Sequence, residues 1–175
     1  MNILQIVPSF EVGGAETMCV GLCLELRKLG HSVTAVSLSA AQSKLTRDLT
    51  EAGVELRLLG KGPGMDLSCV SRLRALIREV RPQVIHTHLH ALKYAALALG
   101  GGKIPILHTV HNQAEAEAVK LDQLMARYLF HSGKATPVAL SGEIQASIVA
   151  LYGLPESRVP VVCNGIDLDR CLRKT

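Results

Sequence analysis

The feature that most constrains this sequence is a regular alternation of short β-rich runs with longer stretches of helical periodicity. The runs expected as strands are residues 3–7, 31–39, 54–59, 84–87, 104–110, 136–140 and, as a last buried strand, 159–163. The stretches expected as helices are one after Gly14 that stops at Gly30, residues 40–52, 66–81, 94–99 and 114–131, and one opened by Ser141 and Glu143. Strands that alternate with helices over short connections run parallel, with right-handed crossovers between them. The sequence therefore predicts an α/β fold, a doubly wound and mainly parallel Rossmann-like sheet with helices on both faces.

The composition agrees with one folded domain. Of the 175 residues, 48% are hydrophobic and 19% are charged, which is enough apolar material for a buried core in a chain of single-domain length. Residues 164–175 leave the last expected strand through Asn-Gly and turn polar without completing another element. We expect residues 1–163 to form the domain and residues 164–175 to begin a linker to a further domain.

Charge and aromatic content argue against two classes of partner. The net charge of +4 is spread along the chain, and aromatic residues make up only 3% of it, so platforms for stacking bases are few. The longest apolar stretch in the centre of the chain, residues 94–102, is shorter than the ~20 residues that span a bilayer. We expect no nucleic-acid partner and no membrane span.

The N-terminus and the cysteines favour a cytoplasmic location. The chain opens directly on the expected strand at residues 3–7, without a basic leader or a cleavage site. The five cysteines form an odd set with no Cys-x-x-Cys pair, which is typical of a reducing compartment.

Paired glycines follow the first expected strand. Gly13 and Gly14 stand where a helix begins, and the partial positive charge of a helix N-terminus, together with its exposed amides, favours an anion such as a phosphate. The spacing differs from the dinucleotide-binding pattern Gly-x-Gly-x-x-Gly, and no acidic residue closes the second strand, so an NAD site is not expected. The alternative is a tight turn with no ligand.

Five of the seven histidines lie at the ends of two neighbouring strands: His86, His88, His90, His108 and His111. Alternate strand positions face one side, so His86, His88 and His90 could form a metal site, although no nearby carboxylate or cysteine completes it. The alternative is that His86 and His108 are core histidines hydrogen-bonded to the backbone. His111 lies past its apolar run, where a neutral imidazole can hydrogen-bond a substrate.

Two further segments carry polar residues at expected strand ends. Ser141 follows the sixth strand and either caps the next helix or helps to shape a cleft. Asn164 lies in a polar turn after the last expected strand.

The helix expected at residues 66–81 carries arginines on one side. Arg74, Arg78 and Arg81 fall beside an apolar stripe made by Val70, Leu73, Ile77 and Val80. A solvated outer face is one interpretation. The other is an interfacial helix that docks on anionic lipid, which would suit a lipid-linked acceptor.

Taken in order, these segments resemble the N-terminal half of a family-4 retaining glycosyltransferase of the GT-B fold. The resemblance covers nearly the whole chain and rests on five landmarks. They are Gly13-Gly14-Ala15-Glu16, His86-Thr87-His88, Thr109-Val110-His111-Asn112, Ala139-Leu140-Ser141 and Asn164-Gly165-Ile166-Asp167.

The resemblance implies a hexosyltransferase that moves sugar from a nucleotide-sugar donor to an acceptor with retention of configuration. It implies that Gly13 and Gly14 lie beside the donor diphosphate and that His111, the expected catalytic residue, contacts the transferred sugar. No metal or other cofactor is implied. The residues expected to line the cleft or contact the acceptor are Glu16, His88, Asn112, Ser141 and Asn164.

The resemblance also implies a partner domain. In the family a C-terminal domain carries most nucleotide contacts, so we expect the 175 residues alone to be inactive and to self-associate through the surface that this domain covers. The implied setting is polysaccharide or glycolipid biosynthesis, with the acceptor a sugar, a lipid or a small molecule and with peripheral contact at the inner membrane face as one possibility. The alternatives are a non-catalytic subunit of a split transferase and half of a sugar-nucleotide epimerase.

Overall fold

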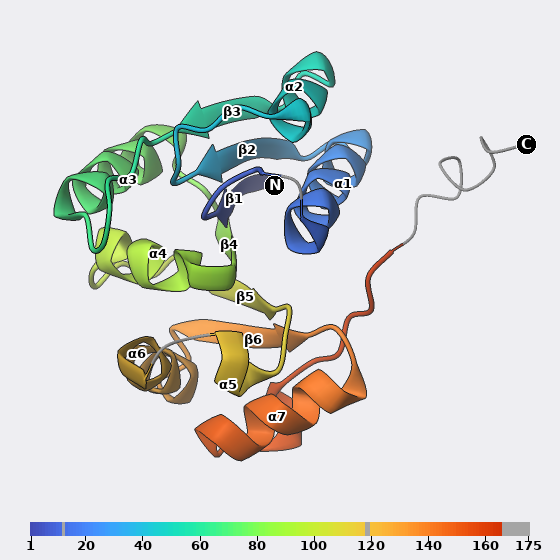
Figure 1. Ribbon diagram of the computed structural model, residues 1–175, viewed down its shortest axis with the longest axis vertical. Coiled ribbons are helices and arrows are strands. Elements are labelled where there is room, and N and C mark those ends of the chain that lie inside the picture. The colour runs from blue at the N-terminus through green and yellow to red at the C-terminus, as the bar shows by residue number, and fades with distance from the viewer. Residues whose placement is uncertain (12, 118–119, 166–175) are drawn as a thin grey trace, which may run out of the picture.

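The computed structural model describes residues 1–11, 13–117 and 120–165, and it contains a six-stranded, all-parallel sheet in the order β3-β2-β1-β4-β5-β6 (Figure 1). The strands are β1 (Asn2–Val7), β2 (Ser32–Ser37), β3 (Glu55–Leu58), β4 (Val84–His88), β5 (Ile106–Val110) and β6 (Ala135–Ala139). The α-helices are α1 (Gly14–Lys28), α2 (Lys44–Glu51), α3 (Leu67–Val80), α4 (Leu92–Leu99), α5 (Ala114–Glu117), α6 (Lys120–His131) and α7 (Gly142–Tyr152). The doubly wound α/β fold predicted from the sequence is confirmed.

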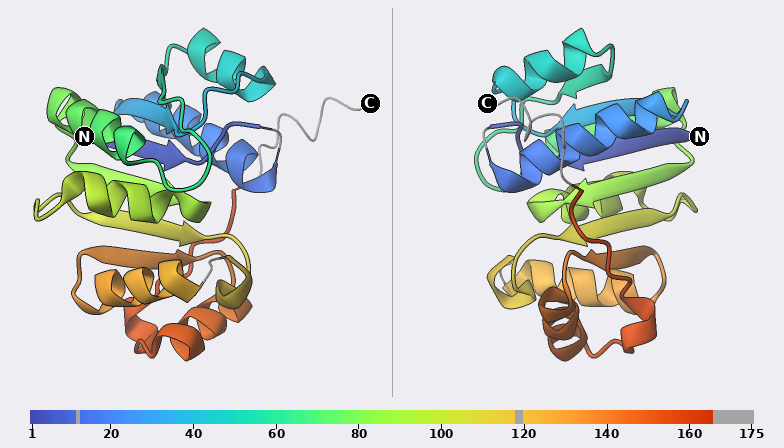
Figure 2. Two further views of the ribbon diagram at one scale, coloured as in Figure 1. Left: turned by 60° about the vertical axis from the view of Figure 1, so that its left-hand side comes forward. Right: turned by 90° about the vertical axis from the view of Figure 1, so that its right-hand side faces the viewer.

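Helices cover both faces of the sheet. Figure 2 shows α3, α4 and α6 along one face and α1 on the other. The core is divided in the same way: Val7, Val33 and Leu49 belong to a cluster on the α1 and α2 side, whereas Leu4 and Ile85 belong to a larger one on the α3 and α4 side. Because neighbouring strand residues point to opposite faces, side chains that lie next to each other in sequence enter different cores.

Side-chain caps fix several helix starts. Asp66 Oδ1 accepts a hydrogen bond from the Cys69 amide at 3.0 Å, which confirms Asp66 as the cap of α3. The helix predicted over residues 40–52 is shorter, because the Ser43 hydroxyl accepts from the amides of Leu45 and Thr46 and so starts α2 at Lys44.

The prediction of a buried strand at residues 159–163 is wrong. Val161 alone forms an isolated parallel bridge with Ala139, and Val161 and Val162 are 40% and 58% exposed, although Val159 is fully buried. Pro160 has no N–H to donate to a ladder, so the pairing does not extend towards Val159. The bridge consists of two bonds, in which the Ala139 amide donates to the Pro160 carbonyl and the Val162 amide donates to the Ala139 carbonyl. The one long helix predicted over residues 114–131 is described as α5 and α6, and residues 118–119 lie outside the described part.

The apolar stripe of α3 faces the protein interior. Leu73 and Ile77 are buried in the core, and Arg74 donates to the main-chain carbonyls of Leu97 and Ala98 at the end of α4. An interfacial role for α3 would therefore rest on Arg78 and Arg81 without an apolar face. In the part of the chain that the structure describes, no helix combines the length and the hydropathy needed to cross a bilayer.

The Tyr94 hydroxyl ties the loop after β3 to α4. It accepts from the Asp66 amide and donates to the Gly64 carbonyl, each at 3.2 Å, and the residue is 1% exposed. We expect Tyr94→Phe to lower the free energy of unfolding by about 1–2 kcal/mol, since both bonds are lost inside the protein. Urea unfolding measures this. Tyr128→Phe is the control, because Tyr128 is 60% exposed, and an equal loss there would contradict the explanation.

Candidate functional site

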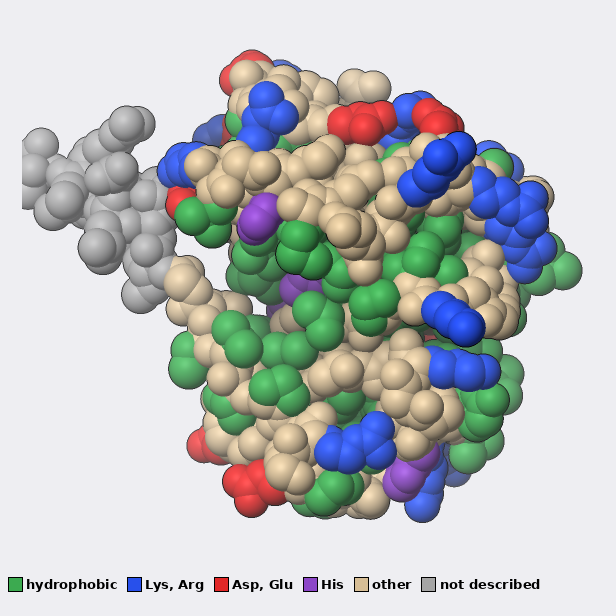
Figure 3. Space-filling view, turned by 180° about the vertical axis from the view of Figure 1, so that it is seen from behind, with side chains coloured by type: hydrophobic (Ala, Val, Ile, Leu, Met, Phe, Trp, Pro, Cys, Tyr) green, Lys and Arg blue, Asp and Glu red, His purple; other side chains and the backbone are tan. Residues whose placement is uncertain are grey.

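The carboxyl ends of the strands meet at one edge of the sheet. Because β1, β4, β5 and β6 are parallel and, in this order, neighbours, the segments that follow them lie side by side (Figure 2). This places Gly14, His88, His111 and Ser141 at the same edge, as the sequence predicts. Seen from behind, the surface is hollowed between its upper and lower halves, and a histidine side chain lies in the hollow among hydrophobic side chains (Figure 3).

The two glycines at the start of α1 differ in their surroundings. Gly13 is the N-cap, with an extended backbone (φ −155°, ψ 168°) and no side-chain cap. A Cβ on Gly13 would collide with the Glu16 carboxylate, whereas one on Gly14 would meet no described atom within 4 Å. Glu16 thus places its own negative charge at the helix N-terminus, where an anionic ligand would also be favoured.

A buried chain of polar side chains links β1, β4 and the loop after β5. Gln5 Oε1 lies 3.0 Å from His88 Nε2, and His88 Nδ1 lies 3.1 Å from His111 Nε2. His88 is fully buried, and the His88 and His111 ring centroids are 5.3 Å apart. The side chains of Gln5, His88 and His86 occupy alternate strand positions on the face that α1 covers, so His111 and the start of α1 share both an edge and a face of the sheet.

His86 lies beside this chain without belonging to it. Its Nε2 is 2.8 Å from Thr109 Oγ1, and its ring centroid is 4.2 Å from that of His88. Burial, with smaller contributions from His108 and His111, lowers the pKa of His86 from 6.5 to about 4. Burial also lowers the pKa of His88 well below 6.5, with help from His86. Both imidazoles are therefore neutral at pH 7.

Among the described residues, the histidine cluster does not form a metal site. No three or more His, Cys, Asp or Glu side chains there are placed to hold a metal ion. His90 lies in a short 3-10 helix (Leu89–Ala91) and does not join His86 and His88. His108 points to the opposite face, where its Nδ1 is 2.9 Å from Thr87 Oγ1. Both His86 and His108 thus lie within hydrogen-bond distance of a threonine hydroxyl, and for His86 this side chain takes the place of the expected backbone partner.

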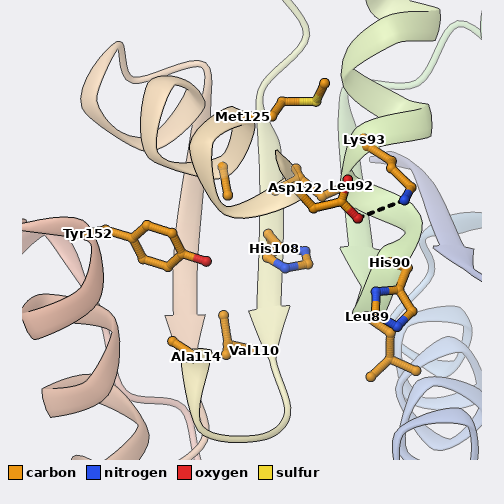
Figure 4. Close-up of a pocket in the computed structure, with 11 residues that line it drawn as sticks. Leu89, His90, Leu92, Lys93, His108, Val110, Ala114, Asp122, Met125 and Tyr152 are labelled. Atoms are coloured by element: carbon orange, nitrogen blue, oxygen red, sulfur yellow. Dashed lines mark hydrogen bonds and ion pairs between the residues drawn. The ribbon is translucent and has the colours of Figure 1, made fainter. Parts of the chain in front are cut away.

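A separate small pocket of about 30 Å³, partly open to solvent, lies on that opposite face between α4, α6 and β5. In Figure 4 the His108 ring and the Tyr152 hydroxyl point into it, and an ion pair of 2.7 Å between Lys93 and Asp122 joins α4 to α6 beside it. His90 lines this pocket. No sequence pattern indicates this pocket, because its walls come from six separate elements.

The other expected site residues are distributed along the edge. The Ser141 hydroxyl accepts from the Ile144 amide at 3.3 Å, so Ser141 caps α7 as one of its two interpretations predicts. Asn112 is exposed next to His111, and Asn164 is exposed in the segment that leaves the bridge at Val161. Their expected contacts with a ligand stay predictions.

Sequence reasoning missed Gln5. A glutamine between Leu4 and Ile6 in an otherwise apolar strand is the signal that could have identified it, because an amide at a buried position needs a partner. Its partner, His88, is 83 residues away in sequence.

Comparison with known families decides the assignment. The model for Glycosyltransferase Family 4 matches residues 12–170, nearly the whole sequence. The chain belongs to glycosyltransferase family 4. The resemblance to the N-terminal half of a GT-B enzyme of this family is confirmed, and family membership supports a transferase domain.

Solved structures share the fold of this family-4 domain. HepE of Anabaena, in complex with UDP and glucose, is 19% identical with a TM-score of 0.78, and the match covers 97% of this chain and 46% of HepE. A glycosyltransferase from Rickettsia africae is 20% identical with a TM-score of 0.76 and coverages of 95% and 44%. The UDP-GlcNAc 2-epimerase of Neisseria meningitidis, bound to UDP-GlcNAc, is 16% identical with a TM-score of 0.63 and coverages of 94% and 46%.

The chain therefore spans about half the length of these three structures. At such low identities the likeness shows the fold alone. A comparison with curated proteins gives no match.

Proposed function

We propose that this domain is the acceptor-side half of a retaining glycosyltransferase that takes its sugar from a nucleotide-sugar donor and needs no metal. One observation carries the proposal: the glycine start of α1 and the bonded pair His88 and His111 share one edge and one face of the sheet. The amides at a helix N-terminus can bind a diphosphate, and an imidazole can hydrogen-bond a sugar hydroxyl. The diphosphate and the sugar of a nucleotide sugar could therefore both bind at this edge.

In this proposal the donor diphosphate approaches Gly14, where the backbone is open. Glu16 turns away from Gly13 when the diphosphate binds, because two negative charges at one helix N-terminus repel each other. UDP is the appropriate first probe, since HepE and the epimerase, which share the fold, are described with UDP or a UDP-sugar.

Gly14→Ala tests the donor position. The change fits the protein itself, because a Cβ there meets no described atom within 4 Å, so stability is expected to stay equal or to rise slightly. UDP affinity is expected to fall about tenfold, since the methyl group keeps a phosphate from the backbone amides. Calorimetric titration of the protein completed through its second domain measures the affinity.

The matched control is Gly21→Ala, which makes the same change in the same helix at an exposed position with equally open surroundings. An equal loss of UDP affinity in both variants would contradict donor binding at Gly14, and so would an unchanged UDP affinity in Gly14→Ala.

The 175 residues alone are expected to transfer no sugar, because most donor contacts lie in the second domain of the family and no Lys or Arg of the recognised motifs neutralises the leaving diphosphate. Comparing this chain with the completed protein, in a thermal-shift and transfer screen of nucleotide sugars, tests the proposal. We expect the donor to raise the melting temperature of the completed protein and that protein to transfer sugar. We expect neither result for the 175 residues alone. Interconversion of donor sugars would favour the epimerase alternative, and binding without either reaction would favour a non-catalytic subunit.

The proposal includes a cytoplasmic location and a partner C-terminal domain of the GT-B type. Exposed apolar side chains such as Leu107, Val161 and Val162 favour self-association of the isolated domain. Contact with anionic lipid, if the acceptor is lipid-linked, would use two exposed arginines, Arg78 on α3 and Arg81 directly after it. The acceptor-facing residues in this proposal are Asn112, Ser141 and Asn164.

A further inference from the structure

The buried amide of Gln5 is not explained by packing. Gln5 is 1% exposed in the centre of β1, between fully buried Leu4 and Ile6. Its Oε1 accepts a hydrogen bond from His88 Nε2, but its own Nε2 is buried without a hydrogen-bond partner among the described residues. A buried donor without a partner lowers stability, and an apolar side chain of similar size would avoid that cost. The hydrogen bond that Gln5 Oε1 accepts from His88 therefore calls for a functional explanation.

The direction of the hydrogen bonds follows from this amide oxygen. An amide oxygen only accepts, so the proton of His88 is on Nε2. A neutral imidazole with a proton on Nε2 has a lone pair on Nδ1, and that atom faces His111 Nε2 at 3.1 Å. His111 must then donate from Nε2. Burial lowers the pKa of His88, which keeps it in the neutral form that this chain requires.

We propose that Gln5 and His88 are positioning residues that hold His111 in its Nε2–H tautomer and fix the orientation of its ring at the edge where the donor sugar is proposed to lie. The inference rests on the proposed function in one respect, the presence of the sugar at His111. Gln5 and His88 act through His111 and have no contact with the sugar. His86, two residues before His88 on β4, bonds separately to Thr109 and does not set the tautomer.

Nitrogen-15 NMR tests the tautomers without any donor. In the histidine-labelled chain at pH 8, long-range proton–nitrogen correlations distinguish a proton on Nδ1 from one on Nε2. We expect both His88 and His111 to carry it on Nε2. A proton on Nδ1 of either residue would overturn the proposal, and this result does not depend on whether the protein transfers sugar.

Substitutions separate positioning from simple structural support. Gln5→Met keeps the size of the side chain and removes the acceptor, so His88 and His111 are expected to lose the strong preference for Nε2–H. Thr109→Val removes the partner of His86 and is expected to leave the tautomers of His88 and His111 unchanged. Unchanged tautomers in folded Gln5→Met, or equal changes in both variants, would overturn the assignment. If Gln5→Met does not fold, the wild-type spectrum decides.

Kinetics of the completed protein gives the last readout. We expect Gln5→Met to lower kcat/KM for transfer about tenfold, because part of the His111 population then loses the tautomer and the ring orientation that the bond from Nε2 to His88 fixes. A Gln5→Met protein with altered His111 tautomers and wild-type kcat/KM would overturn the positioning role. Absence of transfer by the wild-type completed protein would refute the proposed function, while the NMR result would still decide the tautomer.

Discussion

Replacing His111 with alanine in the protein completed through its second domain is expected to lower kcat/KM for sugar transfer by about 100-fold or more. The imidazole is held by His88 at the edge where the donor sugar is proposed to lie, so its loss removes a preoriented hydrogen bond near the reacting centre. Steady-state kinetics with the donor identified by thermal shift measures the effect.

The control for this prediction is His31→Ala. His31 lies at the opposite edge of the sheet, just before β2, where its Nδ1 is 3.2 Å from the N-terminal amine. Wild-type kinetics is expected for it. A His111→Ala protein that folds and keeps more than a third of the wild-type kcat/KM would contradict a direct role for His111, whatever His31→Ala shows.

The free energy of unfolding is expected to fall steeply as the pH decreases from 6.5 towards 4. His86 has a pKa of about 4 in the folded protein, below its ordinary 6.5, so the unfolded chain binds protons that the folded chain does not. Stability from the neutral form is fully present above pH 6.5 and is lost as the pH falls towards 4. The loss from His86 alone is about 3 kcal/mol, and His88, whose pKa is also lowered, adds to it.

Urea unfolding at several pH values between 7 and 4 measures this dependence. His86→Gln keeps a polar side chain near Thr109 but cannot titrate, so its stability is expected to fall less over the same range. His31→Ala, which removes a half-buried histidine at the opposite edge of the sheet, is expected to follow the wild-type slope. Equal slopes for wild type and His86→Gln would show that protonation of His86 is not the cause.

The Glu16 carboxylate competes with an anionic ligand for the N-terminus of α1, which the sequence alone did not suggest. Its carboxylate lies against Gly13, although the motif was interpreted as an open anion site. Glu16 is three positions after Gly13, and one turn of α1 brings its carboxylate back to the helix start. The expected diphosphate site is therefore Gly14 and the neighbouring amides rather than both glycines equally.

Sequence patterns were sufficient for the elements of the fold and for several of their ends. The apolar run of β1 and the periodicity of α3 each depend on residues within a few positions of one another, and Asp66 caps α3 through an amide three residues away. Residues 159–163 show the limit, because their apolar character predicts a strand, but Pro160 and the exposed sheet edge allow a single bridge.

The amino-acid sequence by itself determined the alternation of strands and helices, the parallel sheet that follows from it, and the loops in which glycines and histidines would meet. Only the tertiary structure decided which histidines bond to each other, because that depends on strand order and on the face to which each side chain points. Placing β1 next to β4 brings Gln5 to His88 across 83 positions, and the alternation of faces sends His108 away from His111. Local propensity is encoded by neighbours along the chain, whereas a buried hydrogen-bonded chain exists only after distant strands have paired.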